Sequence, residues 1–268
     1  MDIREDIRAL LLVILWDIRK LGRYKFFLAM RFAWFLLQVL VFGLLVAKMV
    51  SIRGPLGVID YYKFYIIGAY VAVLFSMSML RGHEIVEELE DGLIDYQLSL
   101  PIKRRILAIG RALGGGIASF IYSIPMMIVI VLILGVNSIS AVLAIALFSL
   151  IFASSLVGLA MSIALTIRSS DRLDILMGIS DSLLVRLSTV FYPIIALSSI
   201  AIYYYIAKIN PVSYLTDMIR YIATPEDASG ITVSDPHIMV VFLVGFAIAS
   251  MLSALLLLEK RIEGGYSR

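Results

Sequence analysis

Residues 139–167 read ISAVLAIALFSLIFASSLVGLAMSIALTI, a run that contains no Asp, Glu, Lys or Arg. A helix needs about 20 mainly apolar residues to cross the roughly 30 Å hydrocarbon core of a bilayer. The whole chain of 268 residues shares this character, because 61% of its residues are hydrophobic and only 16% are charged. Soluble domains average roughly 45–50% apolar and roughly 25% charged residues. The chain is therefore predicted to fold in a lipid bilayer, which excludes a soluble enzyme, a nucleic-acid-binding protein and a disordered scaffold.

The same length and apolarity criterion identifies further spans on both sides of this run. The expected membrane-spanning helices cover residues 26–47, 62–80, 106–134, 139–167, 173–196 and 238–258. Backbone amides cannot stay unpaired in hydrocarbon, so each span is expected to be helical. The predicted fold class is an all-α membrane protein with six transmembrane helices, forming a single transmembrane domain over residues 1–268.

Positive charge sets the expected orientation, because Lys and Arg are retained in the cytoplasmic loops of membrane proteins. Both termini, the segment 81–105 and the turn after the fourth span hold most of the 23 Lys and Arg residues. The opposite side keeps Lys48, Arg53, Lys63, Lys208 and Arg220. We therefore expect a multi-pass protein of the plasma membrane with both termini in the cytoplasm. The absence of cysteine and the short loops fit a prokaryotic source.

Residues 1–25 are expected to form an interfacial helix and not a cleaved signal peptide. No small-residue cleavage site follows the apolar run that ends at Trp16. Apolar residues recur on one helical face, at Ile3, Ile7, Leu11, Ile14 and Ile18. The charged residues Arg4, Glu5, Arg8 and Arg19 lie elsewhere on the helix. This pattern is typical of a helix in the cytoplasmic membrane interface. The alternative is the buried start of an unusually long first span.

The chain lacks the residues that catalysis and metal binding need. It has no cysteine and two histidines, and the segment His83-Glu84-Ile85-Val86-Glu87 lacks the second histidine of a zinc-binding helix. Gly114-Gly115-Gly116 is not followed by the Gly-Lys-Ser/Thr of a phosphate loop, and small residues there favour close helix packing. No catalytic residue, metal ligand or bound cofactor is therefore expected in this chain.

Asp181 and Arg186 lie within the expected fifth span, with Ser182 between them. A charge at the centre of a bilayer costs at least about 2.5–3.5 kcal/mol, so both side chains are expected to face the protein interior or water. One interpretation is structural pairing. The other is a polar lining of a substrate path, in which Gln38 and Arg31 of the first span would take part.

An acidic segment separates the second and third spans. Apolar residues recur four apart at Ile85, Leu89 and Leu93, and five acids surround them: Glu84, Glu87, Glu88, Glu90 and Asp91. The spacing predicts a short amphipathic helix, a break at Gly92 and a second helical stub that ends at Pro101. The segment is either a solvated loop or a cytoplasmic contact surface for a partner protein.

Two motifs in the chain resemble the permeases of ABC type 2 transporters. The first comprises Glu88, Glu90, Gly92, Asp95, Tyr96, Leu98, Ser99 and Pro101, followed by Arg104, Arg105 and Gly110. It resembles the family segment E-x-E-x-G-T-x-E-x-L-x-S-x-P-x-x-R-R, with Leu93 and Asp95 in place of the usual residues. The second comprises Phe191-Tyr192-Pro193 and the segment NPVSYLTDMIR at 210–220, which resemble the family's F-F-P and N-P-x-[ST]-Y-L-x-[DE]-x-[IL]-R elements.

The resemblance implies the ABC type 2 exporter fold and a permease subunit that is not itself an enzyme. Two permeases, either two copies or related chains, would assemble with two ATP-binding subunits that carry ATP and Mg²⁺. The resemblance places the contact with the ATPase on the N-terminal helix and the acidic loop. The residues concerned are Arg4, Arg8, Arg19, Glu84, Glu87, Glu88, Glu90, Asp91 and Gly92.

The family analogy also implies that residues 197–236 form re-entrant helices at the outer surface. We interpret this segment as an external gate, with an ordinary surface loop as the alternative. The gate residues would be Tyr192, Pro193, Asn210, Pro211 and Tyr214.

The leading functional hypothesis is an ATP-driven exporter of a hydrophobic or amphiphilic compound, such as a drug, a lipid or a lipid-linked glycan. Its expected partners are the ATPase, the second permease and membrane lipids, with no nucleic acid. One alternative is an ion-coupled secondary transporter that uses Asp181. A non-transporting membrane scaffold is another.

Overall fold

The computed structural model describes residues 3–20, 25–49, 52–54, 57–100, 102–167, 169–228 and 230–263. Several residues of the sequence interpretation lie outside these ranges, namely Pro101, the turn residue Arg168 and parts of the segment 1–25. The side chains of His83 and Asp95 also lie outside the described part.

Helices dominate the described chain. The elements before the two strands are α1 Ile3–Lys20, α2 Lys25–Leu37, the π-helix η2 Gln38–Gly43 and α3 Leu44–Met49. The strands β1 Ile52–Gly54 and β2 Gly57–Ile59 precede α4 Tyr61–Glu90, α5 Leu93–Ser99, α6 Arg104–Leu134 and α7 Ile139–Ile167. The remainder is α8 Ser170–Ser180, the π-helix η3 Asp181–Val185, α9 Ile194–Leu197, α10 Ala201–Ile209, α11 Pro211–Ala223, α12 Pro225–Ala228 and α13 Pro236–Glu263.

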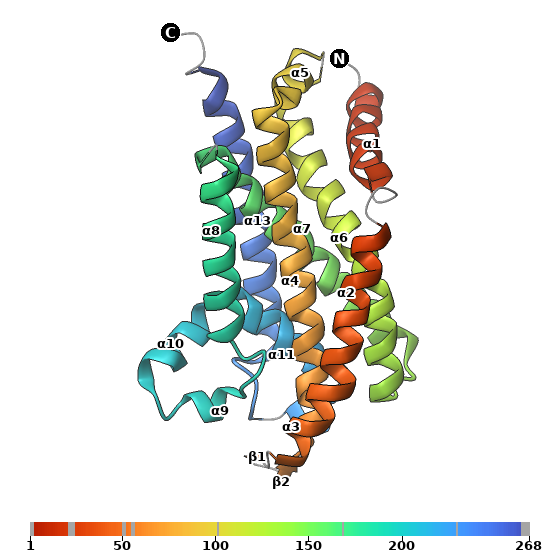
Figure 1. Ribbon diagram of the computed structural model, residues 1–268, viewed down its shortest axis with the longest axis vertical. Coiled ribbons are helices and arrows are strands. Elements are labelled where there is room, and N and C mark those ends of the chain that lie inside the picture. The colour runs from red at the N-terminus through yellow and green to blue at the C-terminus, as the bar shows by residue number, and fades with distance from the viewer. Residues whose placement is uncertain are drawn as a thin grey trace.

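Five helical stretches within the described ranges are long and apolar enough to cross a membrane. They are Leu28–Val46, Tyr61–Glu90, Arg104–Leu134, Ile139–Ile167 and Pro236–Glu259. Figure 1 shows these long helices side by side, with the start of α1, α5 and the end of α13 at one end of the bundle and the hairpin at the other. The chain is therefore a helical, multi-pass membrane protein.

The expected fifth span, 173–196, is wrong as one continuous helix. The helix formed by α8 and η3 ends near Arg186, and a short irregular segment follows before α9 begins at Ile194. Pro193 cannot donate a helical hydrogen bond, and Thr189 of this segment pairs with Ser213 and Asp217 of α11 instead. A six-span count therefore does not follow from helix length and apolarity.

Two further expectations are corrected. The all-α prediction misses the antiparallel hairpin of β1 and β2, in which Ile52 pairs with Ile59. The separate acidic helix is also wrong, because α4 continues without a break from the second span to Glu90. Its residues Ile85, Val86 and Leu89 are buried in a second apolar cluster with α6, α7 and α13, so the packing surface extends beyond the expected span. At about 1.5 Å per residue, such a helix exceeds the roughly 30 Å hydrocarbon core.

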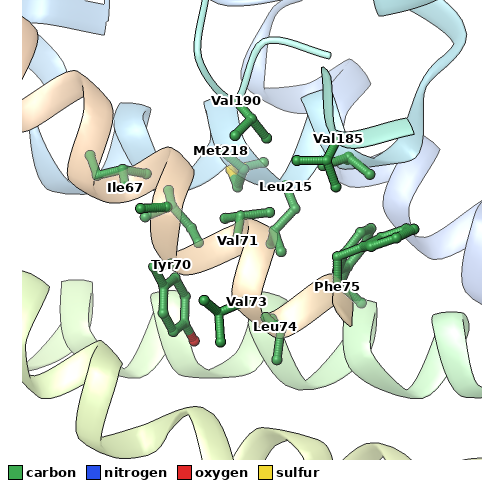
Figure 2. Packing of buried hydrophobic residues seen from close by; sticks show 14 of the residues in the cluster. Ile67, Tyr70, Val71, Val73, Leu74, Phe75, Val185, Val190, Leu215 and Met218 are labelled. Atoms are coloured by element: carbon green, nitrogen blue, oxygen red, sulfur yellow. The ribbon is translucent and has the colours of Figure 1, made fainter. Parts of the chain in front are cut away.

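Helix α4 lies at the centre of the bundle. Of its most apolar window, 78% is buried, compared with 17% for Leu28–Val46, so α4 packs against protein while the outer helices keep apolar side chains exposed. Figure 2 shows Val71 of α4 beside Leu215 of α11 with Met218 close by, and all three belong to the buried apolar cluster. Exposed apolar side chains on the outer helices are the ordinary condition of a protein in lipid.

Helix α1 packs in register along the first turns of α6. Asp6 pairs with Lys103, Val13 contacts Gly110, and Asp17 contacts Gly114. A Cβ atom at Gly110 would lie 2.8 Å from Val13 Cγ1, so glycine is needed for this close approach. Because the same sequence offset relates all three contacts, α1 runs parallel to α6 (Figure 1) and does not lie flat across the bundle, as an interfacial helix would.

The irregular segment after η3 is held by one buried arginine. Arg220 of α11 is 1% exposed and donates hydrogen bonds to the carbonyl oxygens of Thr189 (2.6 Å), Val190 (2.9 Å) and Phe64 (3.1 Å). Its guanidinium also donates to Asp217 Oδ1 at 2.7 Å. Non-helical backbone is tolerated at membrane depth only where protein satisfies its polar groups. Arg220 is therefore a buried group of the bundle, whereas sequence reasoning counted it only among the cations of the side opposite the termini.

Asp217 completes this arrangement. Its carboxylate accepts hydrogen bonds from Thr189 Oγ1 (3.0 Å) and the Val233 amide (2.7 Å), besides the one from Arg220. On its other side, the segment 189–190 packs closely against Gly68 of α4. A Cβ atom at Gly68 would lie 2.0 Å from the Val190 carbonyl oxygen. The segment 189–190 therefore lies against α4 on one side and α11 on the other.

We predict that Arg220→Gln destabilises the purified protein strongly, because it leaves Asp217 and several buried carbonyl groups without a cationic donor. Breaking a buried ion pair by removing one partner costs about 3–5 kcal/mol. The measurement is the fraction of monodisperse protein after heating in detergent. Lys208→Gln is the matched control, since Lys208 is exposed on the adjacent helix α10. Equal thermal stability of the two variants would contradict the role given to Arg220.

Candidate functional site

A cavity of about 690 Å³ lies between α2, η2, α4, η3 and the segment that follows η3. Four of the five residues that the sequence singled out for a polar path line the cavity, namely Arg31, Gln38, Asp181 and Arg186. Ser182 does not line it. Aromatic side chains complete the wall, among them Trp34, Phe191 and Tyr192. The structure thus brings Arg31 of the first expected span together with Asp181 and Arg186 of the fifth around one space.

Both π-helices border this cavity. Gln38 is the first residue of η2, and Asp181 is the first residue of η3. Short π-helical insertions within α-helices occur frequently at functional sites, since they displace a side chain from its α-helical position. Sequence spacing carries no signal for these two insertions, so this feature of the site was not predicted.

The hydrogen bonds of the cavity argue against the structural-pairing interpretation of Asp181 and Arg186. Ser76 of α4 donates its hydroxyl hydrogen to Asp181 Oδ1 at 2.7 Å. Among the described residues, no ion pair joins Asp181 to Arg186. Asp181 is therefore connected to α4, and Arg186 lies exposed at the cavity wall.

The five residues expected to form an external gate fall into two groups. Tyr192 lines the cavity, and the adjacent Pro193 is the N-cap residue of α9. Asn210 and Pro211 instead begin α11, where the Asn210 side chain accepts from the Val212 amide and donates to the Leu184 carbonyl at 2.7 Å. Tyr214 stacks on Phe242 of α13, with ring centroids 3.7 Å apart. The structure therefore places the second group in the packing of α11.

A second cavity of about 630 Å³ lies between α1 and the end of α4 that carries the acids. Its wall combines apolar side chains of α1 with charged ones of both helices: Leu12, Leu15, Trp16, Arg19, Lys20, Glu84, Glu87, Glu88, Asp91 and Leu93. We call this space the α1–α4 groove. Arg4 and Arg8 are exposed on α1 but are not part of the groove wall.

The acids of segment 84–91 differ in their environments. Glu84 pairs with Arg81 at 2.6 Å, and Glu90 accepts a hydrogen bond from the Ser170 amide at 3.0 Å. Glu88 is buried. Glu87 and Asp91 are exposed at the groove, and the left-handed backbone of Gly92 (φ 70°) then turns the chain into α5. Only some of the predicted contact residues are thus presented to a partner.

Glu88 belongs to a buried ionic cluster with Asp17, Lys20 and Arg111. Arg111 of α6 is 5% exposed, and its guanidinium donates to Asp17 Oδ1 and to Glu88 Oε2, both at 2.5 Å. Lys20 also pairs with Glu88. Burial raises the pKa of the Asp17 carboxyl above its usual value, and the nearby Arg111 and Lys20 oppose this shift. The cluster ties α1, α4 and α6 together, and sequence reasoning missed it because its members are distant along the chain.

No three His, Asp or Glu side chains gather into a metal-binding group within the described ranges.

Comparison with known proteins places these features in a family. A family model described as ABC-2 type transporter matches residues 8–224, which is well over half of the chain and includes both cavities and Arg220. No curated protein matches the chain. The family is the membrane component of ABC transporters, it is not itself catalytic, and it implies association with an ABC ATPase. With its apolar helices, its cavity and its extended α4, this chain belongs to the ABC-2 type transporter family and is a permease component.

Proposed function

We propose that this permease forms half of the membrane part of an ATP-driven exporter. A second copy or a related permease chain completes the membrane part, and two ATP-binding subunits carry ATP and Mg²⁺. The exporter moves a hydrophobic or amphiphilic compound, such as a drug, a lipid or a lipid-linked glycan, out of the cytoplasm by alternating access. Family membership supports the permease role, and the cavity beside Asp181 supports a path for the substrate.

The observation that carries the proposal is the continuity of α4. One helix bears Glu87 at the α1–α4 groove and Ser76 at the cavity. The helical rise between these two residues is about 16 Å, at about 1.5 Å per residue. A displacement that a partner imposes at the groove is therefore carried to the cavity by a single rigid element, as in rigid-body transitions of helices.

The ionic cluster around Arg111 extends this coupling to two more helices. Because Arg111 binds Asp17 and Glu88 together, α1 and α6 would move with α4 when the ATPase closes around ATP. The bond from Ser76 to Asp181 is the contact between this unit and η3. A relative movement at that bond would change the cavity wall, which is how ATP binding would drive alternating access.

On this proposal, the ATPase binds the exposed acids of the groove. Replacing both Glu87 and Asp91 by Gln and Asn should reduce recovery of the ATPase subunit with the tagged permease by about tenfold, because interface charges direct docking and their removal weakens it. The measurement is ATP hydrolysis and subunit stoichiometry in the purified complex. Glu226→Gln is the matched control, since Glu226 is an exposed acid on α12 outside the groove.

Undiminished recovery of ATPase in the double variant would refute the groove as the docking site. If recovery falls, a monodisperse double variant on gel filtration shows that docking and not folding is lost, as expected because neither Glu87 nor Asp91 is buried.

Neutralising Asp181 should abolish transport and leave assembly intact. Asp181→Asn removes the charge next to Ser76 within the cavity, and we expect at least about a tenfold loss of ATP-dependent accumulation of fluorescent amphiphiles in inside-out vesicles, as for loss of an intramembrane functional charge. Ser182→Ala is the matched control, because Ser182 is adjacent but does not line the cavity. Loss of the ATPase from the Asp181→Asn complex would instead indicate a structural role.

The same vesicles separate the exporter from an ion-coupled carrier. Transport by the exporter requires ATP and persists when ionophores collapse the ion gradients. Transport that continues without ATP and stops with ionophore would support the secondary transporter that uses Asp181.

A further inference from the structure

The wall of the cavity between α2, α4 and η3 carries more positive than negative side chains. Its ionisable wall residues, apart from tyrosines, are the cations Arg31 and Arg186 and the single carboxylate of Asp181. Part of the hydrogen-bonding capacity of Asp181 is already used by the hydroxyl group of Ser76. The wall therefore presents a net positive charge to whatever enters the cavity.

Within the cavity wall, the guanidinium of Arg186 is the clearest candidate for pairing with an anion. It is exposed at the cavity, and within the described ranges it forms no ion pair. An arginine beside an apolar bundle is expensive unless an opposite charge or water compensates it. The planar guanidinium group suits the paired oxygens of phosphate and carboxylate groups.

The rest of the wall is suited to a hydrocarbon chain. Trp34 and Ile200 are 57% and 49% exposed, and both border the cavity beside apolar residues such as Val185. Trp34 belongs to α2, whose exposed apolar side chains would meet lipid, and Ile200 directly precedes α10. The volume of about 690 Å³ lies within the range of sites for small amphiphilic molecules.

We propose that this cavity binds an amphiphile with an anionic head group, whose phosphate or carboxylate lies against Arg31 and Arg186 and whose chain lies against Trp34. This inference rests on the proposed function and narrows its substrate class. Neutral drugs and cationic amphiphiles are disfavoured, since their head groups would supply no anion to the Arg186 guanidinium in a wall of net positive charge.

The fluorescence of a native tryptophan can report ligand binding at this site. It has two tryptophans, and Trp34 lines the cavity while Trp16 lies in the α1–α4 groove. Trp16→Phe therefore leaves Trp34 as the only tryptophan. The full chain with this change is purified in neutral detergent micelles and titrated with phosphatidylglycerol or phosphatidylcholine, each with the same doxyl-labelled acyl chain, which quenches nearby tryptophan fluorescence.

We expect half-maximal quenching by phosphatidylglycerol at an about tenfold lower mole fraction than by phosphatidylcholine, as one added ion pair would produce. Arg186→Gln or Arg31→Gln in the same background should abolish most of this preference. Arg172→Gln should preserve it, because Arg172 is an exposed arginine of α8 that does not line the cavity. Unlabelled phosphatidylglycerol should restore the fluorescence, and inorganic phosphate should not.

Equal quenching by the two lipids in the Trp16→Phe protein, or a preference that survives both cavity substitutions, would overturn the proposal. Displacement by inorganic phosphate alone would overturn the amphiphile as the ligand. The assay needs neither ATP nor the ATPase, so a negative result leaves the exporter proposal standing. Conversely, a permease that recovers no ATPase would refute the exporter without affecting the measured lipid preference.

Discussion

The buried guanidinium of Arg220 satisfies backbone carbonyl groups that no helix satisfies. The segment after η3 leaves helical geometry inside a bundle of apolar helices, where an unpaired carbonyl costs several kcal/mol. Arg220 binds Thr189, Val190 and Phe64, and so connects this segment to α4 and α11 at once. The cavity depends on this arrangement, because Phe191 and Tyr192 of its wall directly follow the anchored residues.

A second ionic cluster acts at the other end of the same helix. Arg111 joins α1, α4 and α6 beside the α1–α4 groove, whereas Arg220 joins α4 to α11 beside the irregular segment. Helix α4 is thus fixed to different neighbours at its two ends. Such an arrangement suits an element that transmits displacement, because α4, together with α1 and α6, can move against η3 at the Ser76–Asp181 contact.

Sequence reasoning predicted those features that depend on local composition. The membrane environment, the helical class and the membership of the ABC-2 family are confirmed by the apolar helices and the family match. It also named Arg31, Gln38, Asp181 and Arg186, because a charged or amide group within an apolar span is conspicuous. Their meeting in one cavity depends on tertiary packing, and the sequence offered it only as one of two interpretations.

The features that were missed depend on long-range partners. Arg220 was counted only as a cation of the side opposite the termini, because its spacing of three from Asp217 does not reveal the non-helical carbonyls of 189–190 that it binds. Helix α4 was expected to end at residue 80, because charged residues begin there, yet Val86 and Leu89 are buried by α6, α7 and α13. The in-register packing of α1 on α6 requires Gly110 and Gly114 to be adjacent to Val13 and Asp17, which no local pattern specifies.

The most direct test of the account is a pair of distance measurements by pulsed electron paramagnetic resonance in the complex with its ATPase. The chain has no cysteine, so labels can be introduced singly at chosen sites. With Lys63→Cys and Glu90→Cys, the latter outside the groove wall, the distance along α4 should stay constant when ATP binds. With Trp34→Cys and Leu183→Cys, the distance between α2 and η3, which both border the cavity, should change. An α4 distance that changes, or a cavity distance that does not respond to ATP, would contradict the claim that one rigid helix couples the two sites.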